Sequence, residues 1–445
     1  MIELPSATKR LLWVTISIFL AALGGCSGAR PKAQGRSPLT VLAWMGGDSP
    51  KLDERVVGEF TRRTGIPVRL VPEPESASQE LTQALALLKH GAGTVDVFQV
   101  DTTWPATVAD YMLDLKDALR GELSDELPQA VENATVKGRV VAAPLFVEYG
   151  MLYYRTDLLK RYGFSHPPRT WKELEAESSR IQAGERRRGH TDFWGYVWQG
   201  ADYEGLTCNA LEWQSSQGGG NLLEPDHTVN VDNPAAIRAF SRASRWVGTI
   251  SPPGVIAYIE EDSRNIWQSG RAAFLRSWSY AYPLAKRSPE IGHRFSVAPM
   301  PAGAARRSSV LGGWYLGISK HTLHRAEAIE FLKYMLGREA QSERAIQGGF
   351  LPATRSLYRD PAVLKAIPSF ALMSDAPESI IRRPASLAGT NYDRVSRAYA
   401  HGVHMILTGK VSASQGATDI QAELVRITGF SNRPPSPDVG KRERQ

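Results

Sequence analysis

Strand-like and helical patterns alternate along the chain from Leu39, and this alternation limits the fold more than any other feature of the sequence. Strand patterns occupy residues 39–44, 66–71 and 95–100, and helical patterns occupy residues 49–65 and 81–91. Ser49 can cap the first helix, with Pro50 at its first position and Gly65 at its end. Because the connections are short, we expect parallel strands covered by helices, which is an α/β fold.

The alternation returns further along, and the chain is too long for one core. Strand patterns occupy residues 141–146, 152–154 and 314–318, and helical patterns occupy residues 171–181, 203–217, 233–249 and 325–336. A length of 445 residues exceeds what a single hydrophobic core usually supports, so we expect at least two domains. Since 42% of the residues are hydrophobic, the chain can form such cores.

The N-terminal segment has the pattern of a bacterial lipoprotein signal. Two basic residues precede an apolar run at residues 11–23, and small residues then lead to Cys26. The run is shorter than the roughly 20 residues of a membrane-spanning helix, so it is typical of a signal peptide. We predict a signal peptide at residues 1–25, lipidation of Cys26 with palmitate-type chains, and a polar tether at residues 26–37. An uncleaved anchor helix, or an ordinary signal peptide with a chance cysteine, is the alternative.

Charge and composition argue against nucleic-acid binding. The formal charge is +7, from 53 Lys and Arg against 46 Asp and Glu. The tightest basic runs, at residues 186–188 and 441–444, contain no interleaved aromatic residues, so they are interpreted as solvated surface.

Cysteine and histidine usage gives no prediction of a metal or a cofactor. Once Cys26 carries lipid, Cys208 is the remaining cysteine, so no intramolecular disulfide and no cysteine cluster can form. The apolar helical surroundings of Cys208 indicate a buried, inert thiol. His401 and His404 can share one face of a helix, but no third ligand has a suitable spacing, and a solvated helix face is the preferred interpretation.

Several short segments resemble the extracellular solute-binding proteins of sugar ABC importers, in particular the trehalose/maltose-binding branch. They are DVFQVDTTW at 96–104, PLFVEYGMLYYR at 144–155, WQGADYEGL at 198–206, WQSGRAAF at 267–274 and LGGW at 311–314. Their order and spacing agree with the family over most of residues 39–425. The resemblance implies a type II-like periplasmic-binding-protein fold with two lobes, central sheets flanked by helices, and a hinged cleft that closes over sugar.

The resemblance also suggests how the lobes divide the chain. The expected boundaries are 38–143 for the first part of the N-lobe, 144–282 for the first part of the C-lobe, 283–330 for a return to the N-lobe, and 331–430 for the C-lobe and closing helices. Residues 431–445 contain several prolines and charges and are expected to be a disordered tail.

A sugar site needs aromatic faces for the ring and polar groups for the hydroxyls, and this chain offers both. In the family, tryptophans at the positions of Trp278 and Trp314 stack on glucose rings, and a glycine at the position of Gly313 bonds a hydroxyl through its backbone. Ligands of open α/β sheets lie beyond the carboxyl ends of strands, near which these tryptophans occur. The other interpretation of either tryptophan is a core side chain, which we prefer for Trp171, Trp194, Trp246 and Trp267.

The polar candidates follow strands or match family positions. Asp101 ends a buried-type strand, where an ionised carboxylate is costly unless it faces water or a hydrogen-bond donor, so we expect it in the cleft. Glu148 and Phe146 stand where the family has Asp and often Tyr. Arg383 matches an arginine that reaches the sugar with its two-pronged guanidinium, and Asp48 lies close to an acidic contact of the N-lobe.

These residues predict a monomeric, lipid-anchored receptor that captures a glucose-containing disaccharide such as trehalose or maltose, without catalysing a reaction. The partners implied by the family are a membrane permease and a separate ATPase, with the protein facing the periplasm or the cell exterior. One alternative is another solute, such as a polyol or glycerol phosphate, although a phosphate favours several cationic groups and Arg383 is the one candidate. A secreted glycoside hydrolase that uses Asp101 and Glu148 is the second alternative.

Overall fold

The first sheet has parallel strands at its centre, as the alternation of strands and helices predicts. In this computed structural model, which describes residues 37–43, 49–91, 93–366 and 379–433, β1 (Leu39–Ala43) pairs in parallel with β2 (Val68–Pro72) and β3 (Val97–Asp101). Helices α1 (Ser49–Thr64) and α2 (Ala77–His90) connect them. Every residue of β1 is buried, which is typical of a strand covered on both faces. The α/β prediction is confirmed for this part of the chain.

Strand β12 (Ser309–Ile318) extends this sheet in the antiparallel direction, between β3 and β6 (Ala143–Tyr149). The described strand order is β13-β6-β12-β3-β1-β2, with β14 paired to β12. The short edge strands are β13 (Leu351–Pro352) and β14 (Ile380–Ile381).

A second sheet has the order β11-β7-β10-β8. Its strands are β7 (Met151–Arg155), β8 (Trp194–Val197), β10 (Ala272–Ser277) and β11 (Phe295–Pro299). Helix α7 (Trp171–Arg187) packs against β8 and β10, and the side chain of Thr170 caps it by accepting a hydrogen bond from the backbone N–H of Glu173. Gly150 alone separates β6 of the first sheet from β7 of the second.

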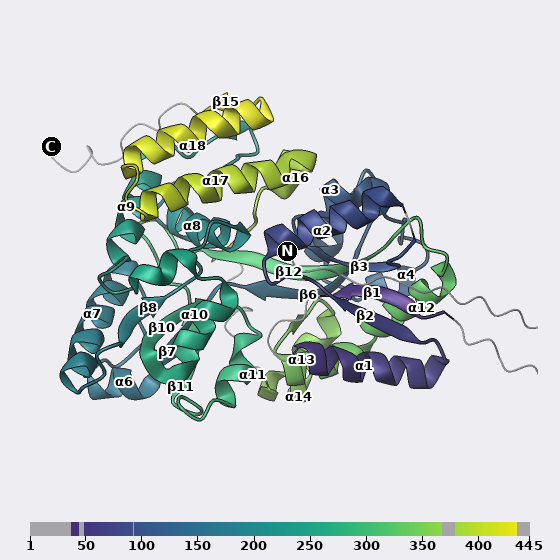
Figure 1. The fold of residues 1–445 in the computed structure, drawn as a ribbon, viewed down its shortest axis with the longest axis horizontal. Helices are drawn as coiled ribbons and strands as arrows, with labels where there is room; N and C mark the ends of the chain where they lie inside the picture. The colour runs from purple at the N-terminus through teal and green to yellow at the C-terminus, as the bar shows by residue number, and fades with distance from the viewer. Residues whose placement is uncertain (1–36, 44–48, 92, 367–378, 434–445) are drawn as a thin grey trace, which may run out of the picture. The chain divides into compact units, whose positions relative to one another are not determined.

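Four helices form a cluster beside the second sheet, two of them from the end of the chain. Figure 1 shows α17 (Tyr392–Leu407) and α18 (Ala413–Thr428) side by side, and they pack on α8 (Glu204–Ser216) and α9 (Pro234–Trp246). Asn233 and Ser412 cap α9 and α18 with their side chains. Buried tryptophans fill the adjacent core, where Trp213 lies 5.0 Å from Trp198 and 5.6 Å from Trp246 between ring centroids.

The remaining described helices and strands lie along the chain between or after these elements. They are α3 (Pro105–Val108), α4 (Arg120–Leu123), α5 (Pro128–Asn133), β4 (Thr135–Val136), β5 (Arg139–Val140), α6 (Thr156–Arg161), β9 (Thr228–Val229), α10 (Glu260–Ile266), α11 (Ala281–Lys286), α12 (Arg325–Leu336), α13 (Arg338–Gly348), α14 (Pro361–Ala366), α16 (Ala385–Ala388) and β15 (Ser431–Asn432).

The strand pairing groups the elements differently from the expected division of the chain. Strand β6 falls almost wholly within 144–282, the expected first part of the C-lobe, but it pairs with β12 in the first sheet. Strand β11 pairs with β7 in the second sheet, so the return to the first sheet occurs between β11 and β12 and not at residue 283. Helix α12 contacts β6 and β12, and helix α13 contacts α1, so both helices pack with the first sheet. Most of their residues fall within 331–430, which was expected to belong to the C-lobe. Strand β15 pairs with β9, so the start of the expected disordered tail is ordered. Strand pairing is a long-range contact that local sequence patterns do not report.

Several of the sequence predictions fall on residues outside the described ranges. These are the signal peptide, Cys26, almost all of the tether, Asp48, and residues 434–445 of the tail. They stay predictions.

Candidate functional site

One cleft brings together most of the residues that the sequence singled out. Its lining comes from three strands of the first sheet, from helices α2, α8 and α10, and from segments next to these elements. The lining residues are Glu75, Ala77, Glu80, Asp101, Phe146, Glu148, Glu204, Gly205, Cys208, Glu260, Glu261, Trp278, Tyr280, Gly312, Gly313, Trp314, Phe350 and Arg383. All the predicted site residues within the described ranges are among them. We call the space that these residues line the cleft.

The register of the first sheet explains why these residues meet. On β12, Trp314 pairs with Asp101 of β3 on one side and with Phe146 of β6 on the other. Glu148 of β6 pairs with Gly312. The three strands therefore carry an acid, a tryptophan and a phenylalanine in one row across the sheet.

Gly313 is required for the close approach of β12 to β6. Its φ is +127°, and an added Cβ would lie 2.4 Å from the carbonyl oxygen of Phe146, so only glycine fits without distortion. The backbone N–H of Thr102 already donates to the carbonyl of Gly313 at 3.2 Å.

The two predicted stacking tryptophans both line the cleft, but they are held differently. Trp314 is half-buried, and its ring meets that of Trp104 edge-on at 5.3 Å. Trp278 is 8% exposed, donates from Nε1 to Glu260 at 3.3 Å, and has the guanidinium of Arg276 3.9 Å from its ring centroid. Each ring is therefore fixed by packing on one side, which preorganises it for a ligand.

The tryptophans assigned to the core follow the prediction with one exception. Trp171, Trp246 and Trp267 are buried. Trp194 is half-buried and has Arg186 over its ring at 4.4 Å.

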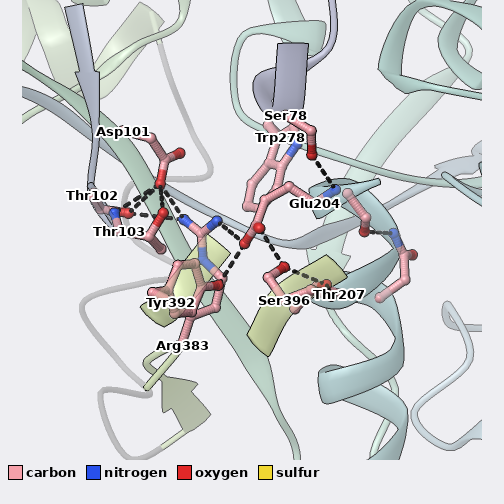
Figure 2. Close-up of polar contacts among 12 residues, drawn as sticks. Ser78, Asp101, Thr102, Thr103, Glu204, Thr207, Trp278, Arg383, Tyr392 and Ser396 are labelled. Atoms are coloured by element: carbon pink, nitrogen blue, oxygen red, sulfur yellow. Dashed lines mark hydrogen bonds and ion pairs between the residues drawn. The ribbon is translucent and has the colours of Figure 1, made fainter. Parts of the chain in front are cut away.

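Arg383 links the two sides of the cleft (Figure 2). Its Nη2 donates to Asp101 at 3.2 Å and to Thr102 at 2.8 Å, and its Nη1 donates to Glu204 at 2.7 Å. Burial lowers the pKa of the Arg383 guanidinium, but the neighbouring negative charges, those of Asp101 and Glu204 among them, have the larger combined effect. The pKa of the guanidinium is therefore above its usual value. Arg383 therefore stays charged in the cleft.

Glu204 connects this ion pair to the C-terminal helices. It is the first residue of α8, and it accepts hydrogen bonds from Tyr392 and Ser396 of α17 as well as from Arg383 (Figure 2). An acidic residue in the first turn is favoured by the helix dipole, so its sequence position alone indicated only a helix start.

Glu148 lies buried on the other side of Trp314. Ser279 donates to it at 3.0 Å, and the backbone N–H of Tyr280 adds a second hydrogen bond. Burial nevertheless raises the pKa of Glu148 to about 8. Near neutral pH its carboxyl group can therefore donate a hydrogen bond as well as accept one.

Comparison with known proteins places the chain in a family. The sequence profile of the bacterial extracellular solute-binding proteins matches residues 46–342. A probable ABC transporter-binding protein of Deinococcus radiodurans is 39% identical over 373 residues, which cover 83% of this chain and 89% of that protein. The chain belongs to the bacterial extracellular solute-binding proteins.

Solved structures confirm the fold of this solute-binding protein. Maltose-bound MalE3 of T. maritima matches with a TM-score of 0.83 and 33% identity, over 88% of this chain and 99% of that chain. A solute-binding protein of Thermotoga lettingae bound with α-D-tagatose matches with a TM-score of 0.79 and 22% identity, over 88% and 100%. The predicted two-lobed α/β fold of sugar-binding proteins is confirmed. Because its relatives are binding proteins of ABC transporters, this chain is a binding protein and not an enzyme.

Most of the acidic lining of this solute-binding protein was not predicted from the sequence. We call the following side chains the cleft carboxylates: Glu75, Glu80, Asp101, Glu148, Glu204, Glu260 and Glu261. Asp101 and Glu148 were predicted, whereas Glu80, Glu204, Glu260 and Glu261 lie in the first turns of helices, where acids are common for local reasons. Tyr280 and Phe350 were also missed, and no local signal marked them.

The remaining chemical groups give no sign of metal or thiol chemistry in the described part of the chain. Cys208 is a buried free thiol, and burial raises its pKa to about 12. The ring of His401 lies 2.7 Å from Asp202, and that of His404 lies 3.1 Å from the carbonyl of Ile256. Among the described residues, no group of three possible metal ligands occurs, and no helix is long and apolar enough to span a membrane.

Proposed function

We propose that this solute-binding protein captures a glucose-containing disaccharide, such as trehalose or maltose, and delivers it to the permease of an ABC importer. The observation that carries the proposal is the row of Asp101, Trp314 and Phe146 across the first sheet, with Trp278 and Arg383 in the same cleft. Aromatic rings suit the apolar faces of pyranose rings, and charged groups suit the hydroxyls at their edges.

The chemistry of the cleft favours a neutral or cationic sugar over a phosphorylated solute. Arg383 is the one basic side chain among the described lining residues, and Asp101 and Glu204 already pair with it. A phosphate would meet the cleft carboxylates without an unpaired cation to bind it. This argues against glycerol phosphate, while an uncharged polyol stays an alternative.

The maltose-bound relative supports a disaccharide in particular. Its fold is similar to that of this chain, with 33% identity and a TM-score of 0.83, and its bound ligand is maltose. Two platforms, Trp278 and Trp314, would suit one ring each.

Calorimetric titration of the mature protein against trehalose, maltose, sucrose, ribitol and glycerol 3-phosphate tests the proposal. We expect 1:1 binding of a disaccharide with a dissociation constant in the micromolar range or below, about −8 kcal/mol or better. Chromatography of the sugar after long incubation should show it intact. If ribitol or glycerol 3-phosphate binds saturably and no disaccharide does, that solute is the ligand and the disaccharide proposal is wrong.

Attachment to a membrane through Cys26 is part of the same proposal. Mass spectrometry of the protein from the membrane fraction should show a mature chain that begins at Cys26 and carries lipid chains. Cys26→Ser should release the protein from that fraction, because the acyl chains supply the membrane affinity. An unmodified Cys26 in membrane-bound protein would indicate an uncleaved anchor helix instead.

A further inference from the structure

Glu80 is a buried cleft carboxylate without an ion pair among the described residues. It lies in the first turn of α2, it is 1% exposed, and it lines the cleft. Its Oε2 has no hydrogen-bond partner, and neither oxygen of the nearby Glu73 has one. A buried carboxylate is unfavourable unless a donor or a positive charge compensates it, so this part of the cleft is incomplete without a ligand.

Other negative groups surround Glu80. The charges of Glu73, Asp101 and Glu260 all act on it, and together with burial, which is the larger cause, they raise its pKa well above the usual value. Helix α2 also contacts the acidic start of α8, where the backbone N–H of Glu204 donates to Ser78 at 3.3 Å (Figure 2). Acidic groups from both sides of the cleft therefore converge near Glu80.

The cations of this region are already engaged elsewhere. Arg383 pairs with Asp101 and Glu204 at 3.2 Å and 2.7 Å. Arg264 pairs with Glu261. Within the described residues, no third guanidinium or ammonium forms an ion pair with a cleft carboxylate.

Neutral donors satisfy two further cleft carboxylates. Glu148 accepts from Ser279, and Glu260 accepts from Tyr203 and from Trp278. Glu80 differs from both because the protein supplies it with neither a neutral donor nor a cation at Oε2.

We propose that the ligand is an amino-substituted glucose disaccharide whose protonated amine pairs with Glu80. This rests on the proposed function, because the aromatic platforms select a sugar, and it narrows the class of sugar. A hydroxyl brings one donor and no charge, whereas an ammonium group brings three donors and a positive charge that favours the ionised form of Glu80 in the complex. The amine has nearly the size of the hydroxyl that it replaces, so the same stacked geometry accommodates both.

The direct test compares each parent sugar with its amino derivatives. Trehalose and maltose are titrated by calorimetry into the mature protein near neutral pH, alongside derivatives in which one hydroxyl, at carbon 2, 3, 4 or 6, is replaced by an amine. We expect at least one amino derivative to bind about tenfold more tightly than its parent sugar. Added salt should weaken the binding of that derivative more than the binding of the parent sugar. N-acetylation of that derivative, which removes the charge, should abolish the gain.

The outcomes separate the two proposals. If a parent disaccharide binds and no amino derivative binds more tightly, the inference about the amine is wrong and the proposed function stands. If neither parents nor derivatives bind, the disaccharide function itself fails, and the inference fails with it.

Glu80→Gln assigns the partner of the amine. The substitution keeps the shape of the side chain, but glutamine cannot form the carboxylate that pairs with the amine. The ratio of the affinity for the amino derivative to the affinity for its parent sugar should therefore fall by about tenfold. Glu54→Gln is the matched control, because Glu54 is an exposed glutamate of α1 that does not line the cleft. If folded Glu80→Gln protein still prefers the amino derivative, Glu80 is not the partner of the amine. If the variant does not fold, the titration of the wild-type protein with parent and amino sugars still tests the proposal.

Discussion

Arg276 and Glu212 form a fully buried, two-pronged ion pair beneath the cleft. Nη2 of Arg276 lies 2.8 Å from Oε1 of Glu212, Nε lies 3.1 Å from Oε2, and both side chains are 0% exposed. Glu212 also accepts from the backbone N–H of Val310 at 3.0 Å, and Arg276 lies under the ring of Trp278. The pair thus joins α8, β10 and β12 directly below a tryptophan that lines the cleft.

Arg276→Met should destabilise the protein by about 3 to 5 kcal/mol, because it leaves the carboxylate of Glu212 buried without its partner. Urea denaturation followed by circular dichroism measures the change in the free energy of unfolding. Arg426→Met is the control, since the Arg426–Glu423 pair is exposed to solvent and should contribute far less to stability than the buried pair. If the free energy of unfolding falls equally in the two variants, the buried pair contributes no more to stability than the exposed pair.

Gly150→Ala should destabilise the protein by about 1 to 3 kcal/mol, because the new Cβ would lie 2.0 Å from Oε1 of Glu212 and disturb the same ion pair. Gly58→Ala in α1 meets no atom within 4 Å and should be neutral or slightly stabilising, since alanine favours a helix. Thermal unfolding of the two variants side by side distinguishes crowding from a general effect of the added methyl group.

Trp314→Ala should weaken disaccharide binding by about tenfold or more, because it removes an aromatic platform of the cleft. Calorimetry gives the affinity, and far-UV circular dichroism reports whether the variant is folded. Trp194→Ala is matched as another half-buried tryptophan, which is not among the cleft-lining residues, and should leave the affinity unchanged. Loss of secondary structure with full affinity in the folded fraction would make Trp314 a core residue.

Arg383→Lys should weaken binding by about tenfold even though the charge is kept, because an ammonium group cannot bridge Asp101 and Glu204 as the planar guanidinium does. The measurement is again the dissociation constant for the best disaccharide. Arg382→Lys alters the exposed neighbour and should have no effect. A similar loss in both variants would mean that the local backbone, and not the guanidinium, determines the result.

Glu126→Gln should make stability less dependent on pH. Burial raises the pKa of Glu126 to about 8, although Thr354 donates to it at 3.1 Å. Between the unfolded pKa near 4.5 and the folded pKa near 8, the native state holds a proton that the unfolded state has lost, so stability falls as pH rises through this range. The contribution is therefore fully present below about pH 4.5 and lost above about pH 8.

Urea denaturation at about pH 5 and pH 8.5 measures this effect. At the higher pH, Glu126→Gln should be more stable than the wild type by about 1 to 3 kcal/mol, and at the lower pH the difference should be small. Glu132→Gln changes an exposed side chain and is the control. An unchanged difference at the two pH values would mean that Glu126 does not titrate in this range.

The local patterns of the sequence were sufficient to predict many elements and part of the cleft. Apolar spacing and end signals predicted α12 at its observed bounds and α1 and α2 to within a few residues, because these signals act over one or two helical turns. Asp101 was predicted from its place at the end of a buried strand, whereas Trp278 and Trp314, which also lie near strand ends, were predicted from the resemblance to the sugar-binding family. The observed cleft contains all three.

Tertiary structure decided what the local patterns could not. The sheet to which β11 belongs, and the row formed by Asp101, Trp314 and Phe146, depend on pairings between strands far apart in the chain. Glu80, Glu204 and Glu260 each resemble an ordinary acid at a helix start until the fold brings them to one space. The sequence by itself determined the α/β class and the aromatic and acidic side chains available for a site. Only the tertiary structure decided which of these charges are buried together, because burial and the distance between charges are properties of the folded chain.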